Sequence, residues 1–350
     1  MQTININTSK PYSVLIGSGL LHGSVHSEKI RDRNVMVVSD DTVYALYGKP
    51  LCSLLKRGGA HIFTFVFPHG EQSKNLSTYG KLLEEMCRVR MTRNDLLVAL
   101  GGGVTGDMAG FAAGTYQRGI DFAQIPTTLL SAVDSSVGGK TGVDLESGKN
   151  MVGVFHQPSH VLCDTDTLLT LPEDEYKNGC AEIIKYAMIG SRRLFQSIKE
   201  VPVSGQYENV ISECVTMKRD LVEKDEFDNG PRMLLNFGHT VGHAVETCSG
   251  YKVPHGKAVA IGMAVITRAA EVSGLCSKDT CDKLLDLLAS YGLPTDTSCD
   301  LSMLSAAIMT DKKSRGGKLT LVVPREIGSC ELMEIPKSSV PEWLKAGGVR

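Results

Sequence analysis

The sequence predicts an α/β fold in which a Rossmann-like domain with a parallel sheet is followed by a mainly α-helical domain, with a cleft between them. Short apolar runs alternate with helical patterns in the first half of the chain, an order typical of parallel strands covered on both faces. Beyond about residue 170 helical patterns dominate, and 350 residues suffice for two domains of ordinary size. We therefore expect one domain over residues 1–170 and another over residues 171–350.

Five apolar runs in the first half predict the strands of the sheet. They are Val35–Val38, Ile62–Phe67, Leu96–Leu100, the run that ends at Ile125, and Val161–Cys163. Between the second and third runs, Tyr79, Leu82, Leu83 and Met86 recur at helical spacing and predict a covering helix. Because ligands bind at the carboxyl ends of strands in such sheets, we expect a site where these runs end.

Three segments of the second half have clear helical patterns, at Tyr207–Val222, Ala258–Ala270 and Cys281–Ser290. Ala258–Ala270 is apolar on almost every side, which predicts a helix buried all round. The third segment ends before Gly292 and Pro294, which are typical helix stop signals.

The composition argues against several classes of partner. Lys and Arg (37) nearly balance Asp and Glu (39), and the net charge of −2 gives no general attraction to nucleic acid. The longest apolar stretch, Ala258–Ile266, is too short to span a membrane, and the first residues do not resemble a signal peptide. The ten cysteines are scattered without a CxxC pair, so we expect free thiols and a cytoplasmic location. A bound metal ion would then need histidine and carboxylate ligands.

The segment Gly101–Gly106 has the pattern G-x-G-x-x-G between a predicted strand and a predicted helix. Glycines there allow backbone N–H groups to approach a pyrophosphate at the helix N-terminus. The motif alone is weak, because Asp107 would repel a phosphate, and a turn that merely requires glycine is the alternative. Residues 126–150 predict a second, glycine-rich loop whose hydroxyls and lysines could hold an anion. Its Gly-Lys-Thr triplet is no P-loop, because Asp134 stands where the first glycine is required.

Three histidines form a candidate metal site. His239 and His243 lie one helical turn apart, and His255 follows in the next segment. Without a glutamate after His239 the pair is not the zinc motif HExxH, and a packed histidine pair is the alternative. Glu182 and Lys185 lie in an apolar helical segment, where an ion pair on an exposed face is the simpler interpretation.

Three further polar residues suggest an anionic substrate. Lys218 falls on the apolar face of the helix Tyr207–Val222, where a lysine is unfavourable unless it is paired or functional. Arg232 and Asn236 lie at even spacing in a predicted strand or loop and would share a face. These cations favour a small substrate that carries phosphate or carboxylate groups.

Long collinear segments resemble a known family. GGGVTGD (101–107) and the sequence that continues to FHQP (155–158), CAEIIKYAMI (180–189), KRDLVEKDEFDNGPRMLLNFGHTVGHAVE (218–246), HGKAVAIGM (255–263) and DKK (311–313) resemble the 3-dehydroquinate synthase family of the sugar phosphate cyclase superfamily. The resemblance extends over roughly residues 35–320 and is densest over 95–263.

This resemblance implies a carbon–oxygen lyase of the shikimate pathway, which leads to chorismate and the aromatic amino acids. The substrate would be 3-deoxy-D-arabino-heptulosonate 7-phosphate, and the products 3-dehydroquinate and phosphate. The implied reaction oxidises C5 transiently with NAD⁺, eliminates phosphate, returns the hydride, opens the ring and closes it by an intramolecular aldol step. A divalent metal ion, Zn²⁺ or Co²⁺, would act on the substrate hydroxyls. Residues 1–170 would bind NAD⁺ and residues 171–350 the metal and substrate, with the active site in the cleft between them.

The resemblance also implies roles for individual residues. The metal ligands would be Glu182, His239 and His255, a set of three that is typical of catalytic zinc. The catalytic residues would be Lys185, His243, Asp134 and Lys218. The substrate-binding residues would be Arg118, Lys140, Asn150, Arg232, Asn236, Lys312 and Lys313. The residues that bind NAD⁺ would be Asp40, Thr42, Glu71, Lys74, Gly102, Gly103, Val104, Asp107, Thr127, Thr128, Lys149, Thr167, Leu168, Leu169 and Thr170.

The resemblance also bears on assembly, because Arg118 would reach the substrate phosphate in a neighbouring subunit, which implies a homodimer. The sequence departs from the family at Lys257, where the family commonly has glutamate, and we expect the side chain of Lys257 to face outward. A sister cyclase is one alternative. Sister cyclases act on phosphorylated sugars that lack a carboxylate, so the presence of Lys218, Arg232 and Asn236, which would bind a carboxylate, favours the dehydroquinate reaction. A metal-dependent polyol dehydrogenase, which would release NADH, and a binding protein without activity are the others.

Overall fold

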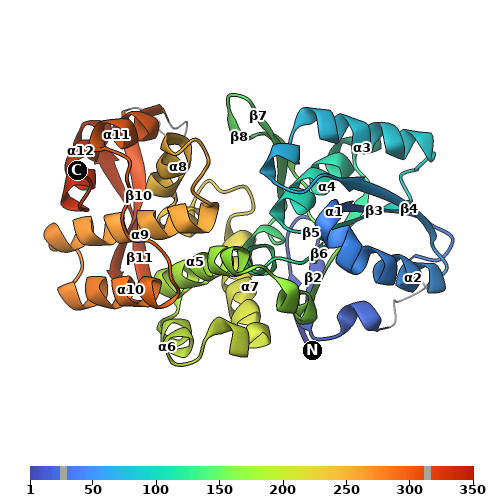
Figure 1. Cartoon of the computed structure of the whole chain (residues 1–350), viewed down its shortest axis with the longest axis horizontal. Helices are drawn as coiled ribbons and strands as arrows, with labels where there is room; N and C mark the ends of the chain where they lie inside the picture. Colours follow the sequence, from blue (N-terminus) through green and yellow to red (C-terminus); the bar gives the residue numbers. More distant parts are fainter. Residues whose placement is uncertain (24–29, 311–316) are drawn as a thin grey trace. The chain divides into compact units, whose positions relative to one another are not determined.

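The computed structural model describes residues 1–23, 30–310 and 317–350, which divide into two units (Figure 1). The first unit comprises Met1–Pro172 and Tyr207–Phe227, and the second comprises Glu173–Gln206 and Asp228–Arg350. The chain therefore leaves the first unit close to residue 170 but returns to it for one helix.

A seven-stranded sheet in the order β1-β2-β9-β6-β5-β3-β4 forms the centre of the first unit. The five predicted runs are confirmed as strands that pair in parallel: β3 (Asn34–Asp40), β4 (His61–Phe67), β5 (Leu96–Gly101), β6 (Asp121–Pro126) and β9 (His160–Asp164). The hairpin of β1 (Gln2–Ile6) and β2 (Tyr12–Gly17) adds an antiparallel edge that the sequence analysis did not predict.

Alternate residues of the central strands fill separate cores on the two faces of the sheet. On one face Val38 packs with α3 (Leu76–Arg88) and α4 (Gly103–Thr115), and on the other Val37 packs with α2 (Lys49–Arg57). Figure 1 shows these helices around the strands, and the predicted helix at Tyr79–Met86 is confirmed as part of α3. Because both faces are covered, polar side chains near the strand ends can form a ligand site.

Residues 126–150 do not form the expected loop. They form a π-helix, Ser131–Ser135, and the start of a hairpin of β7 (Lys140–Leu145) and β8 (Gly148–Phe155) that packs on α4. The prediction was wrong because the glycines serve close pairing of the strands: a Cβ at Gly153 would lie 2.0 Å from the carbonyl oxygen of Thr141. The buried Val143 then anchors the hairpin in the core.

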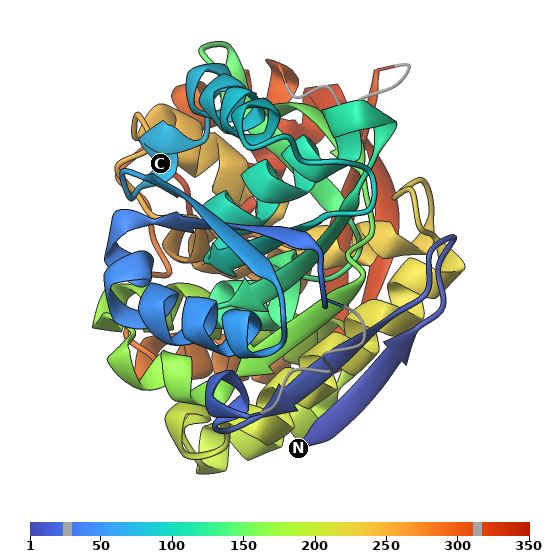
Figure 2. The same cartoon turned by 90° about the vertical axis from the view of Figure 1, so that its right-hand side faces the viewer.

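The helix that returns to the first unit is α7 (Tyr207–Lys224), which extends the predicted helix Tyr207–Val222. It packs against β1 and β2, and Figure 2 shows it beside the first strand. Glu223 accepts a hydrogen bond of 2.7 Å from the backbone N–H of Asn7. The helix thus positions Lys218 within the first unit.

The second unit is mainly helical. Its helices are α5 (Glu173–Gly190), α6 (Arg192–Glu200), α8 (His239–Cys248), α9 (His255–Val272), α10 (Lys278–Ser290), α11 (Leu301–Thr310) and α12 (Val340–Ala346). The predicted burial of residues 258–270 is confirmed, since all but Arg268 are buried. A hairpin of β10 (Lys318–Glu326) and β11 (Ser329–Pro336) was not predicted. In the described ranges no helix has the length and apolar character needed to cross a membrane.

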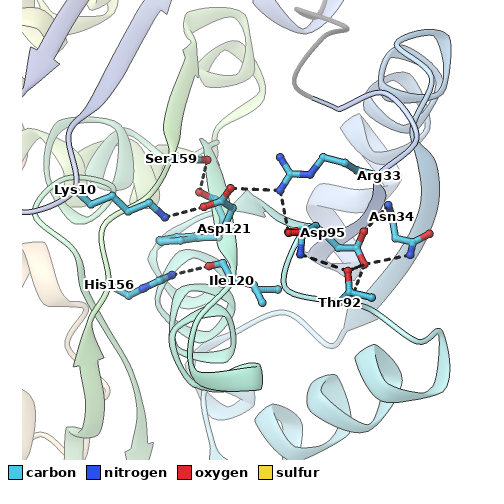
Figure 3. A network of polar contacts seen from close by, with 11 residues as sticks. Lys10, Arg33, Asn34, Thr92, Asp95, Ile120, Asp121, His156 and Ser159 are labelled. Carbon is cyan, nitrogen blue, oxygen red and sulfur yellow. Dashed lines mark hydrogen bonds and ion pairs between the residues drawn. The ribbon is translucent and has the colours of Figure 1, made fainter.

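A polar network joins the amino-terminal ends of the strands (Figure 3). Asp95, just before β5, accepts hydrogen bonds from the backbone N–H groups of Thr92 (2.6 Å) and Asn34 (2.9 Å). Asp121, the first residue of β6, pairs with Lys10 at 2.8 Å. These contacts lie at the opposite ends of the strands from the glycine-rich turn, so we assign them to stability.

The first prediction concerns the acid stability of this network. Although burial disfavours its ionised form, hydrogen bonds from Thr92 and Asn34 lower the pKa of Asp95 below its usual 3.8. Its contribution to stability is therefore complete above pH 3.8 and is lost as the pH falls below that value. We expect Asp95→Asn to lower the free energy of unfolding by about 2 kcal/mol at pH 7 and by less at pH 3, as measured by urea unfolding.

The matched control is Asp282→Asn, which removes an exposed ion pair with Lys278 on α10. This change should cost less than about 1 kcal/mol at pH 7. Equal losses in the two variants would contradict the role given to Asp95.

Candidate functional site

The glycine-rich turn lies where the sequence places it, between the end of β5 at Gly101 and the start of α4 at Gly103. A Cβ at Gly102 would lie 2.9 Å from Thr128 Cγ2, so glycine allows the segment after β6 to approach the turn. The N–H of Thr127 donates to the carbonyl oxygen of Gly101 at 3.0 Å. The Thr127 hydroxyl is buried and has no hydrogen-bond partner among the described residues. With Val104 in the first turn of α4, this arrangement fits an anion at the helix N-terminus.

Asp107 does not make the turn repulsive to a phosphate, because a buried lysine neutralises it. Lys74 Nζ lies 2.6 Å from Asp107 Oδ2 and 2.6 Å from Asn150 Oδ1. Burial lowers the pKa of Lys74, but the carboxylates of Asp107 and Glu71 outweigh this effect and raise the pKa above its ordinary value. Lys74 therefore stays charged, and its positive charge balances the negative charge of Asp107, which the sequence analysis gave as an argument against phosphate binding at this turn.

The hairpin of β7 and β8 brings two more predicted residues to this place. Lys149 Nζ lies 3.6 Å from Glu71 Oε1, and the N–H of Asn150 donates to Asp144 Oδ1 at 2.7 Å. Asn150 adopts a left-handed conformation with φ +53°. The structure thus gathers Glu71, Lys74, Asp107, Lys149 and Asn150 around one cluster, although they come from distant parts of the sequence.

Two residues that the sequence analysis missed organise the remaining predicted nucleotide contacts. Tyr47 donates from its hydroxyl to the carbonyl oxygen of Thr167 at 3.2 Å and also contacts the Thr170 hydroxyl. His69 contacts Asp41, the neighbour of Asp40, through its backbone N–H at 3.1 Å and its ring at 2.8 Å. These contacts join segments that are remote in sequence, so no local pattern could have revealed them.

Within that region the predicted residues differ in exposure. Asp40 caps the helix α1 (Asp41–Val43) by accepting a hydrogen bond of 2.9 Å from the N–H of Val43, and Thr42 is exposed. Leu168 is buried, whereas Leu169 is 75% exposed. The capped end of β3 thus leaves Thr42 accessible to a ligand.

Lys218 is buried and paired, as its place on an apolar face predicted. Its Nζ donates to Asp134 Oδ1 at 2.9 Å and to the Asp134 carbonyl oxygen at 2.7 Å. Lys140 is exposed at the start of β7. Arg118 is exposed on a turn where it and Gln117 both adopt positive φ values, +67° and +48°. Such strain in non-glycine residues is typical of functional segments.

Close packing of three helices positions the candidate metal ligands of the second unit. A Cβ at Gly262 in α9 would lie 1.9 Å from the carbonyl oxygen of Gly238, just before α8. A Cβ at Gly256 would lie 2.4 Å from the carbonyl oxygen of Asn178 in α5. Only glycine permits both approaches, and they bring α5, α8 and α9 together where the ligands lie.

The predicted ligands Glu182, His239 and His255 meet at one point. The Nε2 atoms of His239 and His255 each lie 3.5 Å from the same oxygen, Glu182 Oε1, and one ligand atom of each residue lies within 4.8 Å of the others. His243 is close by, with its ring centroid 5.5 Å from that of His239. In the described ranges, His243, Glu246 and His255 form a second group of possible ligands.

The two imidazoles present their Nε2 atoms because their Nδ1 atoms are engaged elsewhere. His239 Nδ1 lies 3.1 Å from the carbonyl oxygen of Phe237, and His255 Nδ1 lies 3.3 Å from Glu246 Oε2. Burial lowers the pKa of His239 well below its usual value, so its ring is neutral. Burial opposes charge on His255, yet Glu182 and Glu246 raise its pKa to about 10, which shows that this place attracts positive charge. Two imidazole nitrogens and a carboxylate oxygen fit a divalent ion such as Zn²⁺ or Co²⁺.

Glu182 and Lys185 form the i, i+3 ion pair, but in the interior and not on an exposed face. Lys185 Nζ lies 2.5 Å from Glu182 Oε2, and both side chains are only 1% exposed. The exposed alternative was wrong because α9 and the hairpin β10–β11 cover α5.

Arg232 and Asn236 do not lie on a strand or loop. They belong to a short 3₁₀ helix, Pro231–Asn236. Because a 3₁₀ helix has three residues per turn, two residues four positions apart lie about 120° apart around its axis and do not share a face. The alternation argument was therefore wrong, and the proline at the first helical position is the signal that was overlooked. Arg232 is buried.

Lys257 lies at the surface, as expected, and pairs at 2.8 Å with the exposed Asp174 at the start of α5. Its positive charge is thus balanced by Asp174. Lys312 and Lys313, two of the predicted substrate-binding residues, lie outside the described residues.

The fold is that of sugar phosphate cyclases. The structure resembles 2-epi-5-epi-valiolone synthase of Streptomyces hygroscopicus subsp. jinggangensis 5008, described with NAD⁺ and Zn²⁺ bound (TM-score 0.89, 26% identity, 99% of each chain). It also resembles a 2-deoxy-scyllo-inosose synthase complexed with carbaglucose-6-phosphate, NAD⁺ and Co²⁺ (TM-score 0.86, 27% identity, 98% of this chain and 99% of the other). A glycerol dehydrogenase of Schizosaccharomyces pombe shares the fold at 17% identity (TM-score 0.66, 95% and 88% of the two chains).

The sequence comparison identifies the family. Residues 64–178 match the family described as 3-dehydroquinate synthase N-terminal, and residues 179–314 match 3-dehydroquinate synthase C-terminal. A 3-dehydroquinate synthase of Streptococcus sanguinis (strain SK36) is 43% identical over 98% of this chain and 99% of its own length. The chain belongs to the 3-dehydroquinate synthase family.

The packing of α8 on α9 generates the second prediction. Gly262→Ala places a methyl group on the carbonyl oxygen of Gly238, so the helices must separate. We expect a loss of about 3 kcal/mol in the free energy of unfolding and a loss of metal affinity, measured by thermal unfolding and by Co²⁺ titration.

Gly80→Ala in α3 is the control, because a Cβ there meets nothing within 4 Å. It should leave metal affinity unchanged and raise helix stability by up to about 1 kcal/mol. If Gly262→Ala kept the parent stability and metal affinity, the packing argument would be wrong.

Proposed function

We propose that this chain catalyses the 3-dehydroquinate synthase reaction, the conversion of 3-deoxy-D-arabino-heptulosonate 7-phosphate to 3-dehydroquinate and phosphate. It is then a phosphate-eliminating carbon–oxygen lyase of the shikimate pathway. The observation that carries the proposal is the convergence of Glu182, His239 and His255, on helices of a chain that belongs to this family. The sister cyclases and the polyol dehydrogenase are less similar in sequence than the curated 3-dehydroquinate synthase.

The cofactors of the proposed reaction are NAD⁺ and a divalent metal ion. The N-terminus of α4, with Gly102, Gly103 and Val104, suits the pyrophosphate of NAD⁺, and Lys74 keeps Asp107 from repelling it. The proposal assigns the other contacts to NAD⁺ to Asp40, Thr42, Glu71, Thr127, Thr128, Lys149, Thr167, Leu168, Leu169 and Thr170. When bound, NAD⁺ supplies a reversible hydride acceptor and the metal ion supplies a Lewis acid for hydroxyl groups.

The chain's own residues would then bind and orient an anionic substrate. Arg232 can bind a carboxylate through two parallel hydrogen bonds, and its burial strengthens such a contact. Asn236 and Lys218 are proposed as further partners of this group. The phosphate is assigned to Lys140, Asn150 and one of Lys312 and Lys313.

Proton handling is assigned to groups that the structure holds in fixed positions. Lys185 keeps one oxygen of Glu182 engaged, which leaves the other oxygen for the metal ion. His243 lies within 6.0 Å of His255 by ring centroid and is proposed to exchange protons with substrate hydroxyls. Asp134, held by Lys218, is proposed to orient a hydroxyl group.

The third prediction tests the activity itself. Protein loaded with NAD⁺ and Co²⁺ or Zn²⁺ should release phosphate from 3-deoxy-D-arabino-heptulosonate 7-phosphate without accumulating NADH, and a chelator should abolish the release. His239→Ala should lose at least about a hundredfold in rate, because it removes a ligand, whereas the exposed His61→Ala should not. Phosphate colorimetry, absorbance of NADH and identification of the product give the readouts.

Other outcomes lead to other functions. No phosphate release from fully loaded protein would favour a sister cyclase substrate. Accumulation of NADH with a simple polyol would favour the dehydrogenase.

The fourth prediction concerns assembly, because we also propose a homodimer in which Arg118 reaches the substrate phosphate of the neighbouring subunit. The exposed and strained turn at Arg118 supports this role. Subunits inactivated by Arg118→Ala and subunits inactivated by Glu182→Ala should recover part of the activity when mixed, since one mixed site would carry both native residues. No recovery despite demonstrated subunit exchange would refute the shared site.

The cellular location is part of the same proposal. All ten cysteines are free thiols, a state that a reducing compartment maintains. We therefore propose a cytoplasmic enzyme that acts on a small molecule and needs neither nucleic acid nor a membrane.

A further inference from the structure

We propose that Glu246 is a positioning residue of the metal site, which acts on the ion through His255. The inference rests on the proposed function, because it concerns the divalent ion of that reaction. Neither the motif pattern nor the predicted ligand set gave Glu246 a role.

The position of Glu246 in α8 brings it to the ligands. It lies seven residues, about two helical turns, after His239, so both side chains leave the same face of α8. Glu246 is only 3% exposed, and its Oε2 lies 3.3 Å from His255 Nδ1. A carboxylate this deeply buried needs a partner that compensates its charge.

The contact fixes which nitrogen of His255 is available to a metal ion. If Nδ1 donates its hydrogen to Glu246, then Nε2 carries the lone pair, and Nε2 is the atom that lies 3.5 Å from Glu182 Oε1. His239 is oriented in the same way, but its Nδ1 faces the neutral carbonyl oxygen of Phe237. Each histidine is therefore oriented by one acceptor at Nδ1, and of these two acceptors only Glu246 carries a charge.

The charges of the cluster give Glu246 a second effect. Lys185 pairs with Glu182 at 2.5 Å, and this pair has no net charge. Metal binding requires the unprotonated form of both histidines, and in that form Glu182, Lys185 and Glu246 together carry a net charge of −1. We infer that this charge strengthens the attraction of a divalent cation, while the hydrogen bond makes His255 a stronger donor.

A direct ligand role for Glu246 is the competing arrangement, since His243, Glu246 and His255 also lie close enough to share an ion. In that arrangement Glu246 would approach the ion from the side of His255 Nδ1, the nitrogen that it contacts. The convergence of two Nε2 atoms on one oxygen of Glu182 favours the first arrangement.

The fifth prediction compares two substitutions of Glu246. Glu246→Gln keeps an oxygen that can accept from Nδ1 but removes the charge, and Glu246→Leu removes both at similar volume. We expect the dissociation constant for Co²⁺ alone, followed by visible absorbance without substrate, to rise about tenfold in the first variant and about a hundredfold in the second. The larger loss in the leucine variant would show that the hydrogen bond to His255 contributes beyond the charge.

Two controls separate positioning from folding. NAD⁺ affinity, which depends on the first unit, should stay at the parent value in both variants. Glu271 lies on α9, about 24 Å along the helix from His255. The control variant Glu271→Gln should therefore leave the Co²⁺ dissociation constant unchanged.

Three results would overturn the inference in different ways. Unchanged Co²⁺ affinity in both Glu246 variants would remove the role of Glu246 while leaving the proposed function intact. Loss of Co²⁺ binding in Glu246→Gln with retention in Glu182→Gln would make Glu246 a direct ligand. Failure of the parent protein to bind Co²⁺ would remove the metal site itself and with it the proposed function.

Discussion

The candidate metal site of the second unit depends on the close approach of α5, α8 and α9. The carbonyl oxygens of Gly238 and Asn178 occupy the space where side chains at positions 262 and 256 would begin. Any Cβ at these two positions would push the helices apart, and the two Nε2 atoms would no longer face one oxygen of Glu182. The ligand geometry is therefore a consequence of backbone packing, and the histidines alone would not produce it.

Buried lysines recur in both units, always against a carboxylate that belongs to a predicted site. Lys185 pairs with Glu182, Lys74 with Asp107, and Lys218 with Asp134. Burying such a pair removes two charges from water, so these contacts add little stability to the fold. Their value lies in controlling charge: Lys74 makes the glycine-rich turn acceptable to a phosphate, and Lys185 leaves one oxygen of Glu182 to face the histidines. In both units a buried lysine adjusts the charge of a candidate ligand site.

The sheet of the first unit divides stability and function between its two ends. The amino-terminal ends carry the network of Asp95 and Asp121, whose lowered pKa values reflect satisfied hydrogen bonds and ion pairs. The carboxyl ends of β3, β5 and β6 lead into Asp40, the glycine-rich turn and Thr127. Because the cores on both faces hold the strands rigidly, groups at the functional end keep their positions without a ligand.

The sequence by itself determined the features that local patterns encode. The apolar runs predicted the five parallel strands, and the apolar segment 258–270 predicted the buried helix. The local pattern predicted three histidines as metal candidates, and the resemblance to the family added Glu182 to His239 and His255. Only the tertiary structure decided which distant groups meet: Lys74 and Asp107 are 33 residues apart, and Lys218 and Asp134 are 84 apart. It also showed the hairpin β7–β8 in place of a loop, the 3₁₀ helix of Arg232 and Asn236, and the contact of Glu246 with His255. The physical reason is that periodicity reports which face of an element is buried, whereas a partner across the fold is set by how the elements pack.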